Sequence, residues 1–134
     1  MKNKTIIEKG EHIKGTYLKY DWLIMRQDMG HLCGYVRLWK DHPLEAVFLH
    51  SEDIAYDEID IDCHGDLTFS EEVTKKDKDM IKKGFSPGYW IGWDYAHAGD
   101  YTELSPFLGD KKWSVDEVIK ECYDVIEQLT KKYL

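Results

Sequence analysis

Four polar residues in two short blocks of the sequence carry side chains that bind metals or transfer protons. His64 lies in the first block, and Asp94, His97 and Asp100 lie in the second. The last three are spaced at intervals of three, so on one helical turn their side chains face the same way. Imidazole and carboxylate groups are ligands of zinc, manganese and iron, and a bound metal can activate water for hydrolysis.

A structural role is the simpler interpretation of the same four residues. Asp94 and Asp100 can accept backbone hydrogen bonds in a loop, and His64 and His97 can be hydrogen-bonded structural side chains. Their spacing matches none of the sequence motifs of metal sites. We therefore expect no cofactor, and we keep a metal bound by these residues as the alternative.

Aromatic residues alternate with other residue types in the second block. Tyr89, Trp90, Trp93 and Tyr95 are expected to place two rings on each face of a strand. Rings on one face normally build a core, whereas rings on the other can stack on a base or another planar ligand. The lysine-rich residues 75–83 offer cations for a phosphate, although such a run is more often solvated surface.

Cysteine chemistry is not predicted. Cys33, Cys63 and Cys122 are odd in number and contain no CxxC pair, so neither a disulfide framework nor a cysteine-only zinc site is indicated. Structural burial of Cys33 is favoured over a nucleophile paired with His31 or His64.

Length and charge restrict the class of protein further. The 134 residues are 43% hydrophobic, which predicts one domain over 1–134 with enough apolar material to fold alone. The net charge of −8 opposes general binding to nucleic acid or to an anionic membrane. No run approaches the roughly 20 apolar residues of a membrane helix, and the first ten residues are too polar for a signal peptide. We therefore expect a cytoplasmic protein.

Strand-like segments fill the first half of the chain. Residues 17–39 predict a hairpin with a turn at 28–30, because β-branched and aromatic residues flank that turn. A third strand is expected at 46–50. The alternation of apolar and acidic residues over 54–62, followed by a glycine turn and residues 67–69, predicts a second hairpin.

The second half of the chain is expected to end in a helix. Residues 70–83 predict a charged loop or short helix, and residues 85–93 predict a strand. Ser114 and Glu117 form a capping box before apolar residues at helical spacing, which predicts a C-terminal amphipathic helix. Strands followed by a helix indicate an α+β fold, with a mainly antiparallel β-sheet and the helix packed on one face. The other face of the sheet is then expected to be free for a site.

Three blocks of the sequence together resemble a family of small proteins encoded by phages and by prophage regions of bacterial genomes. They are residues 30–36 followed by His42-Pro43, residues 64–69, and residues 90–100. The family has a GYV block with a nearby His-Pro, an HGGLTY-like block and a GFDCAH-x-GD-like block in this order, and a helix at the end. The resemblance covers residues 30–132, and its specificity comes from the combination of blocks.

The chain departs from the family pattern at three positions. Asp66 stands where the family has a second glycine, Trp93 where it has phenylalanine, and Tyr95 where it has cysteine. The last departure argues against a required nucleophile or ligand at that position. The four polar residues described above match the pattern, so the resemblance implies that they belong to a shared site.

The resemblance also implies a biological context. Small accessory phage proteins often act against host defence, and one route is to sequester the nucleotide signal that a defence system produces in the host cytoplasm. A cyclic nucleotide or an ADP-ribose derivative requires aromatic stacking, phosphate donors and backbone amides in glycine-rich turns. We therefore predict a non-enzymatic protein that binds a small nucleotide-like molecule without turnover. The expected ligand-binding residues are His64, Thr68, Trp90, Trp93, Asp94, His97 and Asp100.

Two other functions are kept as alternatives. The first is a metal-dependent phosphoester or glycosidic hydrolase that uses the four polar residues as ligands. The second is an acidic inhibitor module that binds a host protein and is steered to it by charge. The predicted ligand pocket can form within one chain or between the chains of a homo-oligomer, and both arrangements stay open.

Overall fold

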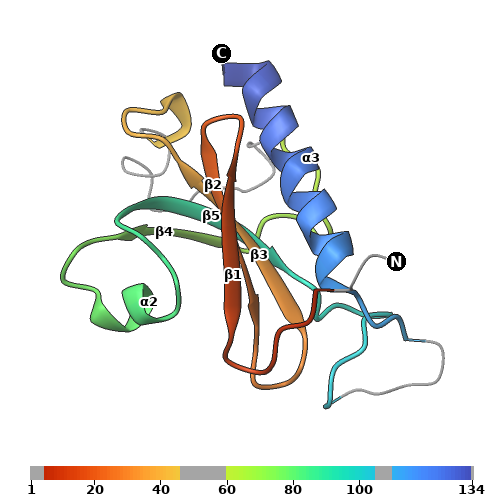
Figure 1. The fold of residues 1–134 in the computed structure, drawn as a ribbon. Coiled ribbons are helices and arrows are strands. Elements are labelled where there is room, and N and C mark those ends of the chain that lie inside the picture. Colours follow the sequence, from red (N-terminus) through yellow and green to blue (C-terminus); the bar gives the residue numbers. More distant parts are fainter. Residues whose placement is uncertain (1–4, 46–59, 105–109, 134) are drawn as a thin grey trace.

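A five-stranded antiparallel sheet with a long C-terminal helix across one face makes up the fold (Figure 1). The computed structural model describes residues 5–45, 60–104 and 110–133. The spatial order of the strands is β1-β2-β3-β5-β4. This arrangement confirms the predicted α+β class. The elements are β1 (His12–Tyr17), β2 (Tyr20–Arg26), β3 (Leu32–Leu38), β4 (Phe69–Val73), α2 (Lys78–Lys82), β5 (Gly88–Asp94) and α3 (Val115–Tyr133).

The first three strands are joined by tight turns. The predicted hairpin is confirmed as β2 and β3, which pair with Asp21 opposite Arg37. The guanidinium Nε of Arg37 donates to the Asp21 carboxylate over 2.9 Å. Strand β1, which was not predicted, pairs with β2 through a turn in which Leu18 and Lys19 have φ of 47° and 72°. Glycine and asparagine usually mark such turns, so the sequence carried no local sign of this one.

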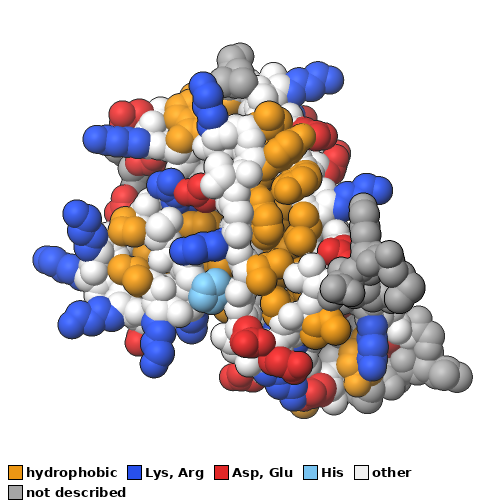
Figure 2. All heavy atoms as spheres, viewed as in Figure 1, with side chains coloured by type: hydrophobic (Ala, Val, Ile, Leu, Met, Phe, Trp, Pro, Cys, Tyr) orange, Lys and Arg blue, Asp and Glu red, His pale blue; other side chains and the backbone are white. Residues whose placement is uncertain are grey.

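The C-terminal helix α3 is present as predicted. Its capping box is formed, because the Ser114 Oγ accepts from the Glu117 N–H over 3.2 Å and Glu117 accepts from the Ser114 N–H over 3.1 Å. Figure 2 shows hydrophobic side chains along α3 beside β1, where the rings of Tyr17 and Tyr123 stack with centroids 4.2 Å apart. The residues that α3 buries against the sheet are Val115, Val118, Cys122, Val125, Ile126 and Leu129.

The sheet face opposite α3 is not free, so that expectation is wrong. Phe85, which is 3% exposed, and Met80 of α2 pack there against Leu23, Tyr35 and Trp90. The charged segment around α2 covers part of this face, because Met80 and Phe85 pack on the sheet while Ile81 and the lysines are exposed. The part of this face that Met80 and Phe85 cover is therefore not open to a ligand.

Strand β5 carries the aromatic block and lies between β3 and β4. Tyr89 and Trp93 point to the core under α3, and Tyr95 joins them just after the strand, whereas Trp90 points to the opposite face. The expected two rings on each face are therefore wrong. Side chains of a strand alternate between faces, and positions 89, 93 and 95 are separated by even numbers.

Other predicted segments fall partly beyond the described residues. The strand expected at 46–50 and most of the run 54–62 lie outside them, and residues 60–62 are not in a strand. The turn after His64 is confirmed, because the Asp66 N–H donates to the Cys63 carbonyl over 3.0 Å. Residues 67–69 lead into β4, which pairs with β5. In the part of the chain that the structure describes, no helix combines the length and apolar character needed to cross a membrane.

A buried histidine joins the end of β3 to the end of α3. His42 is 1% exposed and its ring lies 5.1 Å from the ring of Tyr133. Its Nδ1 accepts the Leu44 N–H over 3.0 Å, and its Nε2 is 2.8 Å from the Tyr20 hydroxyl. Burial lowers the pKa of His42 from 6.5 to about 4.

We expect His42 to make the protein less stable as the pH falls below 6.5. The unfolded chain takes up the proton near pH 6.5 and the folded chain only near pH 4. The free energy of unfolding therefore falls by up to about 3 kcal/mol between these two pH values. Urea denaturation across the interval measures the loss. The control is His42→Asn, whose side-chain oxygen can accept the Leu44 N–H and which has no proton to gain. A stability difference between the two proteins that does not change with pH contradicts the prediction.

Candidate functional site

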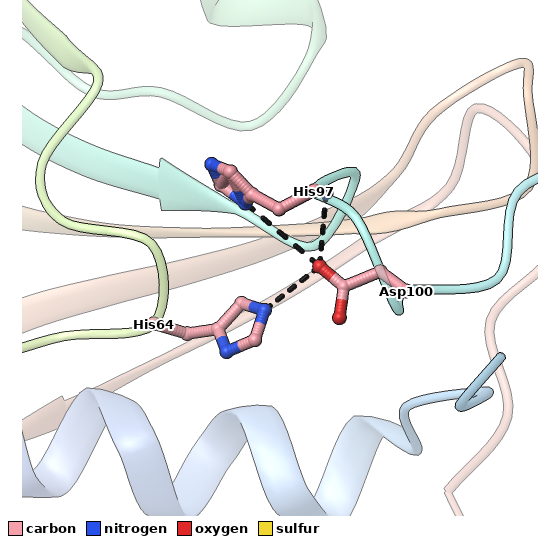
Figure 3. A group of neighbouring side chains, drawn as sticks. All are labelled: His64, His97 and Asp100. Atoms are coloured by element: carbon pink, nitrogen blue, oxygen red, sulfur yellow. Dashed lines mark hydrogen bonds and ion pairs between the residues drawn. The ribbon is translucent and has the colours of Figure 1, made fainter.

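Two turns next to the end of β5 bring His64, His97 and Asp100 together (Figure 3). The Nε2 of His64 lies 2.7 Å from the Oδ2 of Asp100, and the Nδ1 of His97 lies 3.8 Å from the same oxygen. One ligand atom from each residue lies within 4.8 Å of the other two. Both rings thus converge on one carboxylate oxygen.

Asp100 is the centre of this cluster. It is 5% exposed, and its Oδ2 also accepts the backbone N–H of His97 over 3.0 Å. Its Oδ1 accepts the indole N–H of Trp113 over 2.8 Å. Burial by itself raises the pKa of Asp100, but the hydrogen bonds from His64, Trp113 and His97 outweigh it and hold the pKa below its usual value. Asp100 is therefore an ionised, fully bonded carboxylate.

Asp94 and Thr68 lie beside the cluster. Asp94 ends β5, and its Oδ1 accepts the Ala96 N–H over 3.1 Å, which starts the turn that carries His97 and Asp100. The Thr68 hydroxyl donates to the Asp94 Oδ2 over 3.0 Å. The Nδ1 of His97 is 3.6 Å from the Asp94 Oδ1. A second carboxylate therefore borders His97.

Close contacts hold the two histidine rings in place. The ring of His64 stacks on Tyr95 with centroids 4.7 Å apart, and its backbone N–H donates to Glu121 of α3 over 2.7 Å. The ring of His97 lies against Gly65, where φ is +67° and a Cβ would be 2.2 Å from the His97 Cε1. Glycine is thus required there both for its backbone conformation and for the space that the ring occupies.

Five of the seven predicted site residues gather at this point, and two do not. Trp90 and Trp93 are each 1% exposed and belong to the cores on opposite faces of the sheet. Their indole N–H groups donate to the Ser86 carbonyl and to the Tyr95 hydroxyl. These two rings therefore have little surface to offer a ligand. The five that gather are His64, Thr68, Asp94, His97 and Asp100.

A cavity of about 360 Å³ is lined in part by Tyr95 and Trp113, which contact His64 and Asp100 of the cluster. This volume is in the range of small-molecule sites. It lies between the N-terminal residues 6–9, the β2–β3 turn and the chain that follows Asp100. Its polar and aromatic lining residues are Glu8, Lys9, Arg26, His31, Tyr95, Tyr101, Glu103, Lys112 and Trp113.

The three cations of the cavity already have contacts inside the protein. Arg26 donates from Nε to the Ile7 carbonyl over 2.7 Å and from an Nη atom to the Gly30 carbonyl. Lys9 forms an ion pair with Glu103, and the Lys112 Nζ lies 4.3 Å from the centre of the Tyr101 ring. With only two carboxylates among the lining residues, the cavity carries a small excess of positive charge in a chain of net charge −8.

These cations were not identified from the sequence. The lysines of residues 75–83 were expected to meet a phosphate, but they are exposed around α2 and do not line the cavity. The cavity residues come from segments far apart in the chain, and periodicity does not connect such segments. The one local sign was Lys112-Trp113 directly before the Ser114 cap, where two large side chains precede a helix N-terminus.

The three cysteines are buried or half-buried free thiols. Cys33 is buried as expected, and burial raises the pKa of its thiol. Burial also raises the pKa of Cys63 to about 12 and that of Cys122 above its usual value. Because the thiolate is the nucleophilic form, none of the three is prepared for nucleophilic attack.

Comparison with protein-family models, curated proteins and solved structures gives no match for this chain. The class of protein is therefore described by its fold and by the residues of its site. It is an α+β protein with a histidine–aspartate cluster beside an aromatic, weakly cationic cavity.

Proposed function

We propose that the protein binds a small nucleotide-like molecule in this cavity and holds it without turnover. The lining of the cavity carries the proposal, because three aromatic and three cationic side chains border the same space of about 360 Å³. Aromatic rings stack on planar bases irrespective of sequence, and cations form charge-assisted hydrogen bonds with phosphates. A base and a phosphate on one small molecule satisfy both kinds of group.

Trp113 is the ring best prepared to receive a base. Its indole N–H is bound to Asp100 over 2.8 Å, which fixes the ring, and a base that stacks on the side of Lys111 must displace that lysine, whose Nζ lies 3.9 Å from the ring centre. A ring that is already fixed loses little conformational entropy when a ligand stacks on it. The histidine–aspartate cluster therefore supports binding by holding a wall of the cavity.

Arg26 is the cation best placed to meet a phosphate. Two of its nitrogens are bound to backbone carbonyls, which fix the guanidinium, and the group has five N–H donors in total. Lys9 can exchange its pairing with the exposed Glu103 for a phosphate oxygen. The cavity thus combines one fixed and one movable cation.

The resemblance to phage and prophage proteins supports a role for such binding. In this proposal the protein acts in the host cytoplasm and removes a nucleotide signal of a defence system, such as an ADP-ribose derivative or a cyclic nucleotide. Sequestration requires only tight binding and slow release, so it needs no catalytic group in the cavity.

Native mass spectrometry tests the proposal on protein purified from cells with an active nucleotide-signalling defence system. We expect an added small-molecule mass that is released intact on denaturation, and its number per assembly gives the oligomeric state. A cleaved ligand favours the hydrolase alternative. An unmodified mass, together with no binding of ADP-ribose or cyclic di-AMP in calorimetry, contradicts the proposal and favours an inhibitor of a host protein.

Two variants locate the bound molecule. Trp113→Leu and Arg26→Gln are each expected to weaken binding of the probe by about tenfold or more, because stacking on one base contributes about 1–3 kcal/mol and a hydrogen bond to a charged group about 1.5–3 kcal/mol. The matched controls are Trp39→Leu and Arg37→Gln, since neither residue lines the cavity. If the controls weaken binding as much as the cavity variants, the ligand lies elsewhere.

A further inference from the structure

The ring of His97 presents a nitrogen that nothing in the described protein satisfies. Its Nδ1 is buried and has no hydrogen-bond partner among the described residues. The nearest carboxylate oxygens, on Asp94 and Asp100, are 3.6 and 3.8 Å away, which exceeds hydrogen-bonding distance. A buried polar atom without a partner is costly and rare. The unsatisfied nitrogen and the two nearby carboxylates are therefore groups that a further positively charged species could join.

The atoms of these groups are those that a zinc ion binds. Zinc bonds to imidazole nitrogen and carboxylate oxygen are about 2.0–2.2 Å, so ligand atoms of a tetrahedral site lie about 3.4 Å apart. The distances from the Asp100 Oδ2 are 2.7 Å to the His64 Nε2 and 3.8 Å to the His97 Nδ1, which lie on either side of that value. Small side-chain rotations are enough to form such a site.

Each of the three residues is also held by a contact on its far side. Trp113 binds the second oxygen of Asp100, Tyr95 stacks on His64, and Gly65 makes room for the ring of His97. Supporting contacts of this kind orient the ligands of metal sites and strengthen binding. Figure 3 shows both rings directed at the same oxygen of Asp100.

We propose that His64, His97 and Asp100 bind one Zn²⁺ ion through Nε2, Nδ1 and Oδ2. Both imidazoles bind as neutral rings with their proton on the other nitrogen, and Asp100 binds as a carboxylate. The ion takes the place of the proton between the His64 Nε2 and the Asp100 Oδ2, and that proton moves to the His64 Nδ1 or, where Nδ1 already carries one, to solvent. Two histidines and one carboxylate leave a fourth position open, and Asp94 lies beside it. This site is separate from nucleotide binding, since it requires no group of the cavity except the supporting Tyr95 and Trp113.

The test uses the full chain, freed of metal with EDTA and then titrated with zinc alone. We expect one saturable site per chain by calorimetry and a rise in the melting temperature with zinc concentration. His97→Gln is expected to reduce the affinity at least tenfold. The Nδ1 of His97 has no hydrogen-bond partner among the described residues, so this variant is expected to fold. The matched control, His12→Gln on β1, is expected to bind zinc as the unmodified protein does.

Other outcomes overturn the proposal. Zinc affinity that is equal in the His97→Gln and His12→Gln variants, or no saturable binding at all, shows that these three residues do not form a zinc site. X-ray absorption must show nitrogen and oxygen neighbours, and a sulfur neighbour assigns the ion to Cys63 instead. If His97→Gln does not fold, His64→Gln replaces it. Because no nucleotide is present, failure here does not affect the proposed function.

Discussion

Replacing Asp100 with alanine is expected to lower the free energy of unfolding by about 3 kcal/mol. The carboxylate accepts from the His64 ring, the Trp113 indole and the His97 backbone, and the variant leaves all three donors without their acceptor. Each unsatisfied buried donor costs about 1–3 kcal/mol, with the lower values at the partly exposed His64. Urea denaturation in the presence of EDTA measures this loss without any contribution from a metal.

Asp94→Ala is the matched control for this prediction. Asp94 also accepts two hydrogen bonds, from Thr68 and from the Ala96 N–H, but these lie at the surface. Water can replace an exposed acceptor, so we expect a loss of about 1 kcal/mol or less. Equal losses in the two variants would show that water reaches Asp100 as easily as Asp94, and that the buried network does not stabilise the site.

Replacing Trp93 with alanine is expected to lower the free energy of unfolding by about 3–5 kcal/mol. The ring is 1% exposed in the core under α3, and its indole N–H donates to the Tyr95 hydroxyl over 3.1 Å. The variant therefore leaves both a cavity and an unpaired hydroxyl beside His64. Denaturation monitored by circular dichroism measures the loss.

A double-mutant cycle with Gly34 gives this prediction a stricter test. A Cβ at Gly34 on β3 would lie 2.7 Å from the Cζ2 of Trp93, so Gly34→Ala is expected to be destabilising on its own. Phenylalanine has no atom at the position of Cζ2, so Gly34→Ala is expected to cost less in the Trp93→Phe background. Exactly additive losses would mean that the two residues do not compete for the same space.

The helix and the central hairpin could be predicted because their causes are local. The capping box of Ser114 and Glu117 and the apolar period that follows it are contained in one stretch of sequence. The turn between β2 and β3 carries a glycine, Gly30, with φ of +88°. Interactions between residues three or four positions apart, or across a short turn, depend little on the rest of the chain.

The first strand and the opposite face of the sheet could not be predicted in this way. β1 is stabilised by pairing with β2 through a turn of two residues that usually avoid positive φ. The segment around α2 is charged, and the few apolar residues that seat it on the sheet are visible only with the sheet in place. In both cases tertiary contacts outweigh the local preference.

The chemistry of the polar site could be predicted from the sequence, because it depends on residue type. His64, Asp94, His97 and Asp100 were recognised as groups that bind metals or protons, and a short turn was enough to place the last three near one another. What the tertiary structure decided is which groups meet. It brought His64 to Asp100 across 36 positions, buried Trp90 and Trp93, and assembled the cavity from Lys9, Arg26 and Lys112. Burial and long-range contact arise only when separate segments pack together, and no local pattern contains them.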